Sequence, residues 1–412
     1  MLKKKWRIFP LLIVYGLCPF ADGADDSADE ILRLAKAERS AAMRTWKALV
    51  NIDTGTGYEK GLARAQNLLV ARLRALGGQV ETVPASPSAG NNIIGGFRGT
   101  GVAKILLMIH YDTVFPPGEA ARRPFRLEGE RAYGPGVADA KGGIAITLHA
   151  IEMLKDLNFN QYGRLTVLFN SDEETGSFGS RDLIKKLALR HDYVLSFEPP
   201  DQEGVAVQTN GINQLILKVT GRASHAGQAP EEGRNAAIEL AHQLLRLNTL
   251  GDPKKGTTVN WTIVRAGTKA NIIPAFARAE ADMRYTDMIE TDRVLTDARR
   301  IIQAHLIPDT KVKINIERGR PPLLKNEASL TLADLAASIY RNIGRELRPI
   351  AMRFGTDAGY AYSPSSTEPA VLETLGVVGG KLHAPEEFAV VSSVARRLYL
   401  TTRMIMALSQ ND

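Results

Sequence analysis

The sequence predicts an α/β protein with a mostly parallel sheet, into which a smaller α+β domain is inserted. Apolar runs such as 104–110 and 165–169 alternate with helical segments in the first half of the chain, which is typical of a parallel sheet covered by helices on both faces. From residue 213 onward the order changes to strand, helix, strand, strand, helix, strand, as in a ferredoxin-like unit. A chain of 412 residues is long enough to form two separate cores.

The larger domain begins with two helices. Apolar residues at helical spacing predict them over 29–50 and 59–76, and Gly77 and Gly78 end the second. The elements that follow are strands over 80–83, 92–97 and 104–110, a helix over 143–157, a strand over 165–169, a helix over 181–189 and a strand over 193–198.

The inserted domain is predicted to have strands over 213–220, 257–266, 276–285 and 312–318, and helices over 235–248 and 291–305. Pro321 and Pro322 mark the return to the larger domain. That domain then continues with helices over 327–344 and 390–408, separated by a loop through 355–369. We therefore expect one domain formed by 25–210 and 322–412, and a second domain over 211–321.

Residues 1–24 have the pattern of a secretory signal peptide. A basic start is followed by an apolar middle over 8–20 and by small residues at Ala21, Gly23 and Ala24. The apolar part is too short for a stable membrane span. We therefore expect a secreted, periplasmic protein with no stable membrane anchor.

The only cysteine, Cys18, lies inside this segment, so the mature chain has no disulfide and no thiolate ligand. A lipid anchor at Cys18 is the alternative, but Leu17 is larger than the small residue that such processing prefers. The formal net charge is +7, and part of it lies in the signal segment. No basic tract stands elsewhere, which argues against a nucleic-acid partner.

Acidic residues and a histidine lie at the ends of the predicted strands. Asp172, Glu173 and Glu174 follow strand 165–169, His110 ends strand 104–110, and Glu198 ends strand 193–198. An acidic triplet alone would also suit a solvated turn. Ligands, however, bind at the carboxyl ends of strands in an open α/β sheet. Together these residues predict a metal site, and imidazole with carboxylate suits zinc, or manganese and cobalt as substitutes.

The seven histidines differ in context. His110 has Asp112 two residues on, and a ligating imidazole usually gives its other N–H to a carboxylate, which Asp112 could supply. His383 lies in a glycine-flanked loop near the end of the chain, where it could supply a distant ligand, and His225 lies in the inserted domain. We assign packing or surface roles to the rest, which are His149, His191, His242 and His305.

Six motifs carry a resemblance to a known family. They are, in order, HYDTV, GPGVADAKGG, DEETGSFGS, SFEP, GRASHAG and GGKLH. With this order the chain resembles the dinuclear-zinc metallopeptidases and aminoacylases, and most of all the bacterial glutamate carboxypeptidases of the folate-hydrolysing type. The likeness runs from about Leu49 to the final helix.

The resemblance implies two Zn²⁺ per subunit, with Co²⁺ or Mn²⁺ as substitutes. Asp139 would bridge the two ions, Glu173 would be the general base and Asp112 would orient His110. The peptide bond after Asp139 would be cis. The remaining ligands would be His110 and Glu198 on one ion and Glu174 and His383 on the other.

The resemblance also makes 25–210 and 322–412 the catalytic domain, and 211–321 a lid through which the chain forms a homodimer. His225 would reach across the dimer to stabilise the oxyanion of the tetrahedral intermediate. Arg320 would grip the free carboxylate of the substrate. The other implied substrate contacts are Asn271, Arg284, Gly355 and Thr356.

The implied activity is hydrolysis of the amide bond to a C-terminal amino acid, as in a carboxypeptidase acting on N-acyl or folate-like glutamates. The chain departs from that pattern in two places: 201–208 holds no basic residue where the folate-hydrolysing enzymes have a lysine, and Ala140 replaces an acid. An aminoacylase or dipeptidase with another amino-acid preference is therefore the first alternative. A single-metal enzyme and a non-catalytic, metal-binding, receptor-like dimer are the others.

Overall fold

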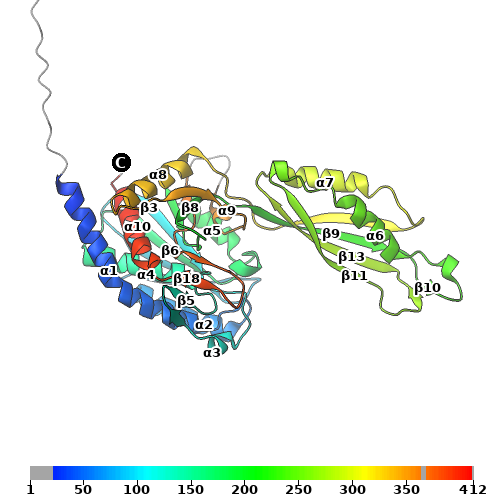
Figure 1. Cartoon of the computed structure of the whole chain (residues 1–412), viewed down its shortest axis with the longest axis horizontal. Helices are drawn as coiled ribbons and strands as arrows, with labels where there is room; N and C mark the ends of the chain where they lie inside the picture. The colour runs from blue at the N-terminus through cyan, green and yellow to red at the C-terminus, as the bar shows by residue number, and fades with distance from the viewer. Residues whose placement is uncertain (1–21, 363–367, 411–412) are drawn as a thin grey trace, which may run out of the picture.

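The computed structural model describes residues 22–362 and 368–410 (Figure 1). Nearly all of the predicted signal peptide, Cys18 included, lies outside the described residues; only 22–24 fall within them, at the start of helix α1 (Asp22–Val50). The larger domain is built on the first half of the chain and its last part, and the inserted domain extends to one side of it (Figure 1).

The larger domain contains a six-stranded sheet with the order β1-β2-β6-β3-β7-β16. The four strands from β6 to β16 are parallel, and β1 and β2 pair antiparallel at one edge. These strands are β1 (Gln79–Pro84), β2 (Asn91–Arg98), β3 (Lys104–His110), β6 (Arg164–Asn170), β7 (Tyr193–Ser196) and β16 (Ala370–Leu372). The predicted mostly parallel α/β sheet is confirmed.

Both faces of the sheet are covered. In β3, Ile105, Leu107 and Ile109 pack into the core under α1, α4 and α10, while Leu106 and Met108 pack into a second cluster with α5 and α9. This two-sided burial explains why the strand reads as one continuous apolar run. Besides α1, the helices of this domain are α2 (Glu59–Ala75), α3 (Glu119–Arg122), α4 (Lys141–Asp156), α5 (Arg181–Ala188), α8 (Glu327–Arg341), α9 (Ala358–Ala361) and α10 (Ser393–Leu408).

The inserted domain has a four-stranded antiparallel sheet with the order β11-β13-β9-β14. Its elements are β9 (Gly211–Thr220), α6 (Ala236–Leu247), β11 (Thr258–Ala266), β13 (Phe276–Tyr285), α7 (Ile289–Ile301) and β14 (Lys311–Arg318). Side chains of β13 alternate between buried and partly buried, because the helices cover one face of the sheet. The predicted ferredoxin-like order is confirmed, and this sheet has its own core around Leu217 and Leu240.

Short elements depart from the sequence-based assignment. The predicted loop 355–369 contains α9, and the helix predicted from 390 begins at Ser393, because β18 (Phe388–Val390) precedes it. Segments of two to five residues are too short to show a period, so the sequence could not reveal them. The others are β4 (Arg126–Glu128), β5 (Arg131–Tyr133), β8 (Gly204–Gln208), β10 (Ser224–His225), β12 (Ile272–Ile273), β15 (Arg348–Ala351) and β17 (Gly379–Gly380).

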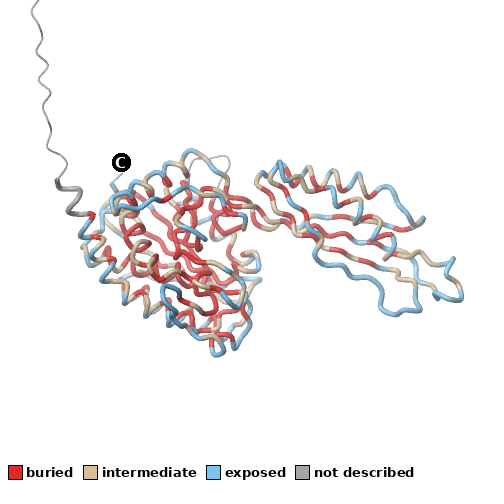
Figure 2. The backbone as a smooth tube through the Cα atoms, viewed as in Figure 1, coloured by how far each residue is buried: buried red, intermediate tan, exposed pale blue. Residues whose placement is uncertain are grey.

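Buried residues gather on the strands of the larger domain and along the sheet of the inserted domain, whose far loops are exposed (Figure 2). Within the described residues, no helix has the length and apolar character needed to cross a membrane.

Candidate metal centre

The candidate ligands converge at the carboxyl edge of the central sheet. His110 is the last residue of β3, Glu198 follows β7, and Glu174 lies in the 3₁₀ turn Glu173–Thr175 after β6. Asp139 lies just before α4, and His383 lies in the loop between β17 and β18. Four of these side chains are buried or nearly so, whereas the His383 side chain is about half exposed.

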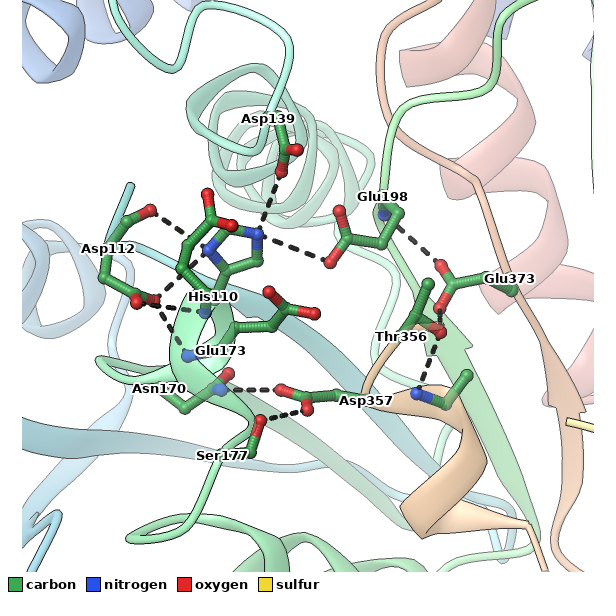
Figure 3. A network of polar contacts seen from close by, with 12 residues as sticks. His110, Asp112, Asp139, Asn170, Glu173, Ser177, Glu198, Thr356, Asp357 and Glu373 are labelled. Carbon is green, nitrogen blue, oxygen red and sulfur yellow. Dashed lines mark hydrogen bonds and ion pairs between the residues drawn. The ribbon is translucent and has the colours of Figure 1, made fainter. Parts of the chain in front are cut away.

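Asp139 lies between two imidazoles. Its Oδ1 is 3.1 Å from Nε2 of His110, and its Oδ2 is 3.2 Å from Nε2 of His383. Glu198 Oε1 approaches the same nitrogen of His110 at 3.4 Å (Figure 3). Glu174 Oε2 approaches Nε2 of His383 at 3.1 Å. The five residues thus form two groups that share Asp139. The Asp139–Ala140 peptide bond is cis, as the resemblance implied.

This donor set fits divalent cations. His110, Asp139 and Glu174 each offer a ligand atom, and these atoms lie within 4.8 Å of one another. The buried Oε1 of Glu174 has no hydrogen-bond partner among the described residues. A buried carboxylate oxygen without a partner is costly unless a cation satisfies it. Imidazole and carboxylate without thiolate is a donor set that suits zinc.

The electrostatics of the site point the same way. Burial alone would lower the pKa of His110. The charge of Glu198 and hydrogen bonds with Asp112 and Asp139 together raise this pKa by more than burial lowers it, so it lies well above the usual value. Hydrogen bonds with Asp139 and Glu174 raise the pKa of His383 to about 11. The carboxylates therefore create a strongly negative field at both imidazoles, which a metal cation would neutralise.

Asp112 organises the turn around His110. Its backbone carbonyl lies 3.0 Å from Nδ1 of His110, an arrangement that leaves Nε2 free to face Asp139. Its carboxylate accepts hydrogen bonds from the backbone N–H groups of Glu173 and Glu174, at 3.1 and 3.2 Å, and from the hydroxyl of Thr56. One residue thus holds both the imidazole and the turn that carries the candidate base.

Glu173 is buried beside the ligand groups, but the ion pairs of His110 and His383 among the described residues are made with other acids. Instead, its Oε1 is 2.7 Å from Nη1 of Arg320. Burial raises the pKa of Glu173 well above the usual value, against the lowering effect of Arg320. Arg320 also contacts the backbone carbonyls of Glu173 and Gly355.

Two buried acids that the sequence analysis did not single out complete the site (Figure 3). Asp357 accepts hydrogen bonds from Asn170 and Ser177. Glu373 accepts one from the hydroxyl of Thr356 at 2.7 Å, and another from the backbone N–H of Glu198 at 3.3 Å. Glu373 directly follows the apolar run 370–372, so it carries the same strand-end signal as Glu198.

Two predicted site residues lie away from the centre of the same chain. His225 is in β10, at the end of the inserted domain remote from the central sheet (Figure 1), where its Nδ1 accepts hydrogen bonds from Gly227 and Gln228. The backbone carbonyl of Asn271 accepts a hydrogen bond from the backbone N–H of Ala226 in the same region. Arg284 lies at the opposite end of this domain, paired with Asp282 at 2.8 Å.

Arg284, Arg320 and Glu174 line one cavity of about 690 Å³ between the two domains. Both polar and apolar side chains line this cavity. The turn after β6 bounds it on one side, and β9, β13 and the segment after β14 bound it on the other. The structure therefore brings Arg284 and Arg320 towards the candidate metal centre, together with Gly355 and Thr356, and leaves His225 and Asn271 outside it.

Comparisons with known proteins agree with this geometry. The model of Peptidase family M20/M25/M40 matches residues 106–407. Carboxypeptidase G2 from Pseudomonas sp. (strain RS-16) is 43% identical over 385 residues, which is 92% of each chain. Acetylornithine deacetylase from Proteus mirabilis is 32% identical over 235 residues, covering 53% of this chain and 59% of the relative.

Among solved structures, a tripeptidase from Staphylococcus aureus superposes with a TM-score of 0.75 at 24% identity, covering 90% of this chain and 99% of the tripeptidase. Human carnosine dipeptidase 1 superposes with a TM-score of 0.71 at 14% identity, covering 93% and 99%. These similarities establish the fold, and the sequence matches extend over its candidate ligands. The chain belongs to peptidase family M20/M25/M40.

Proposed function

We propose that this protein is a two-metal carboxypeptidase that hydrolyses the amide bond to a C-terminal amino acid, with N-acyl or folate-like glutamates as its substrates. The observation that carries the proposal is the position of Asp139, whose two carboxylate oxygens each face a different imidazole, at 3.1 and 3.2 Å. The relative with 43% identity over 92% of both chains is named as a carboxypeptidase. An acid beside the ligands, Glu173, supplies the base that hydrolysis requires.

In this proposal His110 and Glu198 would hold one Zn²⁺, Glu174 and His383 would hold the other, and Asp139 would be common to both sites. Such a pair of ions would supply Lewis-acid activation of water and of the scissile carbonyl. Glu173 would accept a proton from the attacking water and deliver it to the departing amine. Its contact with Arg320 implies that a substrate carboxylate competes with Glu173 for the same guanidinium, which would free the base as the substrate binds.

The substrate is recognised through its free carboxylate. Arg320 and Arg284 supply donors in the cavity between the domains. A second cavity of about 330 Å³ lies beside the segments that carry Glu198 and His383, and its lining includes Arg353 and Lys381 together with one acid, Asp201. These cations offer partners for a second carboxylate, which favours glutamate even though 201–208 contains no lysine. An aminoacylase or dipeptidase with a different preference is the second candidate, favoured by the partial match to acetylornithine deacetylase.

The proposal extends to assembly and location. The edge strand β11 carries exposed Ile263 and Val264, and the neighbouring β13 begins at exposed Phe276. Exposed apolar side chains at an unpaired sheet edge favour association, so we propose a homodimer through the inserted domain. In it, His225 of one protomer would serve the centre of its partner. The signal-peptide pattern predicted over 1–24 supports export to the periplasm.

A substrate panel on zinc-loaded protein tests the activity. We expect release of glutamate from N-acyl-glutamate to exceed release of aspartate and of apolar residues. A chelator should abolish turnover and added zinc should restore it. A preference for an apolar residue would favour the aminoacylase or dipeptidase alternative, and turnover with one ion per subunit would favour a single-metal enzyme. No turnover with any amide would favour the receptor-like alternative.

Glu173→Ala tests the role of the base. We expect the variant to retain two metal ions per subunit and to lose turnover by at least about 100-fold, because general-base catalysis contributes on that order. Metal content by atomic absorption and steady-state rates are the measurements. Unchanged turnover would show that Glu173 is not the general base. Loss of the metal ions would indicate that Glu173 is a metal ligand instead.

A further inference from the structure

A buried carboxylate outside the candidate ligand set holds the loop that carries Asp139. Glu387 is fully buried, and its Oε1 accepts hydrogen bonds from the backbone N–H groups of Ala138 and Asp139, at 2.8 and 3.0 Å. Its Oε2 accepts a third from Gly136 at 3.2 Å. Each of these donors lies in the loop before α4, and none belongs to a helix or strand. The carboxylate therefore supplies the partners that this irregular backbone would otherwise lack.

A buried cation holds the same loop from the other side. Lys141 is almost completely buried, and its Nζ donates hydrogen bonds to the backbone carbonyls of Pro135 and Ile52, at 3.2 and 2.9 Å. The loop thus offers N–H groups to Glu387 and a carbonyl to Lys141. Two buried polar side chains, one acidic and one basic, each hydrogen-bonded to the backbone of the same loop, restrict that loop more than packing alone would.

Glu387 also belongs to the segment that carries the other imidazole. It follows His383 by four residues, and its backbone N–H donates to the carbonyl of Ala384 at 3.0 Å, which closes a turn directly after His383. One side chain therefore spans from the His383 turn to the Asp139 loop. The relative position of these two candidate ligands depends on it.

We infer that Glu387 is a positioning residue of the metal centre, which sets the carboxylate of Asp139 against His383 and thereby determines the affinity for the ion that these two residues share. The inference rests on the proposed two-metal function. Partners that orient metal ligands typically contribute about 10–100-fold to metal affinity. Glu387→Gln keeps the size of the side chain but places an amide NH₂ where one carboxylate oxygen accepted a hydrogen bond, so at least one N–H of the loop loses its acceptor.

The experiment compares wild-type protein, Glu387→Gln and a matched control, Glu239→Gln. Glu239 is also fully buried and accepts backbone N–H groups, those of Leu306 and Ile307 at 2.8 and 2.7 Å, but in the inserted domain. Metal content, zinc affinity by competition with a chelating dye, the visible spectrum of the Co²⁺ form and the thermal midpoint are measured on each. Activity is then titrated with zinc.

We expect Glu387→Gln to bind one ion at least about tenfold more weakly than wild type and to show an altered Co²⁺ spectrum. Added zinc should restore its activity, with an unchanged KM. Glu239→Gln should lose stability without a change in metal affinity. If Glu387→Gln does not fold, Glu387→Asp, which keeps the charge but shortens the reach, is expected to give the same result.

Wild-type metal affinity in the Glu387 variants would overturn the inference, as would a loss of activity that zinc does not restore. Weakened metal binding in Glu239→Gln to the same degree would also overturn it, because general destabilisation would then explain the effect. Wild-type protein that binds no metal would overturn the proposed function as well, so the two failures are distinguishable.

Discussion

The guanidinium of Arg320 lies between the candidate base and the loop that is expected to receive the substrate. It is 2.7 Å from the carboxylate of Glu173, contacts the carbonyl of Gly355 and lies 3.7 Å from Asp357. A planar, fork-shaped donor can serve a carboxylate with two parallel hydrogen bonds, which an ammonium group cannot do. The position of Arg320 therefore combines charge with a defined direction.

Arg320→Lys tests whether that geometry matters for the substrate. The variant keeps the charge and loses the two-pronged donation, so we expect KM to rise about 10-fold or more, since a charge-assisted hydrogen bond contributes about 1.5–3 kcal/mol. Metal content should stay as in wild type. Steady-state kinetics on an N-acyl-glutamate are the measurement. An unchanged KM would show that Arg320 serves Glu173 and Asp357 alone.

The sequence reveals the candidate ligands because each follows an apolar strand or lies in a glycine-rich loop, as His110 and Asp139 do. Asp357 and Glu387 could not be found in that way. Their hydrogen-bond partners are distant in sequence, and whether such an acid faces solvent or backbone N–H groups is decided by tertiary packing. Arg320 is found by resemblance, but its contact with Glu173 depends on how the chain returns from the inserted domain.

At the scale of elements, long periodic segments are predicted well and short ones are not. Strand β3 has the bounds expected from its apolar run, because burial on both faces requires every residue to be apolar. In contrast, β16 has three residues and pairs with β7 as the last strand of the sheet. Nothing local specifies such a strand, since its pairing is set by the segments on either side.

His191 shows how a histidine without a catalytic role ties elements together. It follows α5, its Nε2 lies 2.8 Å from the hydroxyl of Thr166 in β6, and its Nδ1 lies 2.7 Å from the carbonyl of Leu187. Burial lowers the pKa of His191 below its ordinary value. At a pH between the pKa of His191 in the folded protein and its ordinary pKa in the unfolded chain, the folded state therefore binds fewer protons than the unfolded state. The free energy of unfolding falls as the pH drops through this range.

His191→Gln removes this titration while leaving an amide that can bond to Thr166. The contribution of neutral His191 to the free energy of unfolding should be fully present above the pKa of His in the unfolded chain, about 6.5. It should be lost as the pH falls through the lower pKa that His191 has in the folded protein. We expect the free energy of unfolding of wild type to fall more steeply than that of the variant over this range. Denaturant unfolding at several pH values measures it, with His242→Gln as the control. Parallel curves for wild type and His191→Gln would contradict the prediction.

For the whole molecule, the two cores are separate and the candidate site is distributed between them. The core around Leu217 and Leu240 lies wholly in the inserted domain. Strand β10, which carries His225, lies beyond it, away from the central sheet (Figure 1), and Asn271 is hydrogen-bonded to the residue after His225. The fold class and the inserted unit follow from sequence periodicity. The separation of His225 from the metal centre does not, because it depends on how one domain is oriented on the other.

A site that is completed by a second copy can be tested by complementation. Glu173→Ala would remove the base from its own centre. In the proposed dimer, His225→Ala would remove the oxyanion donor of the partner's centre, with an expected loss of about 100–1,000-fold in kcat. A heterodimer of the two variants contains one centre with an intact Glu173 and an intact His225 from the opposite protomer. We therefore expect the inactive variants to regain activity when they are unfolded together and refolded as a mixture, in proportion to the heterodimer measured by native mass spectrometry. Refolding each variant alone is the control. Inactive heterodimers would contradict a role for His225 in the partner's centre. A fully active His225→Ala variant would contradict that role more directly.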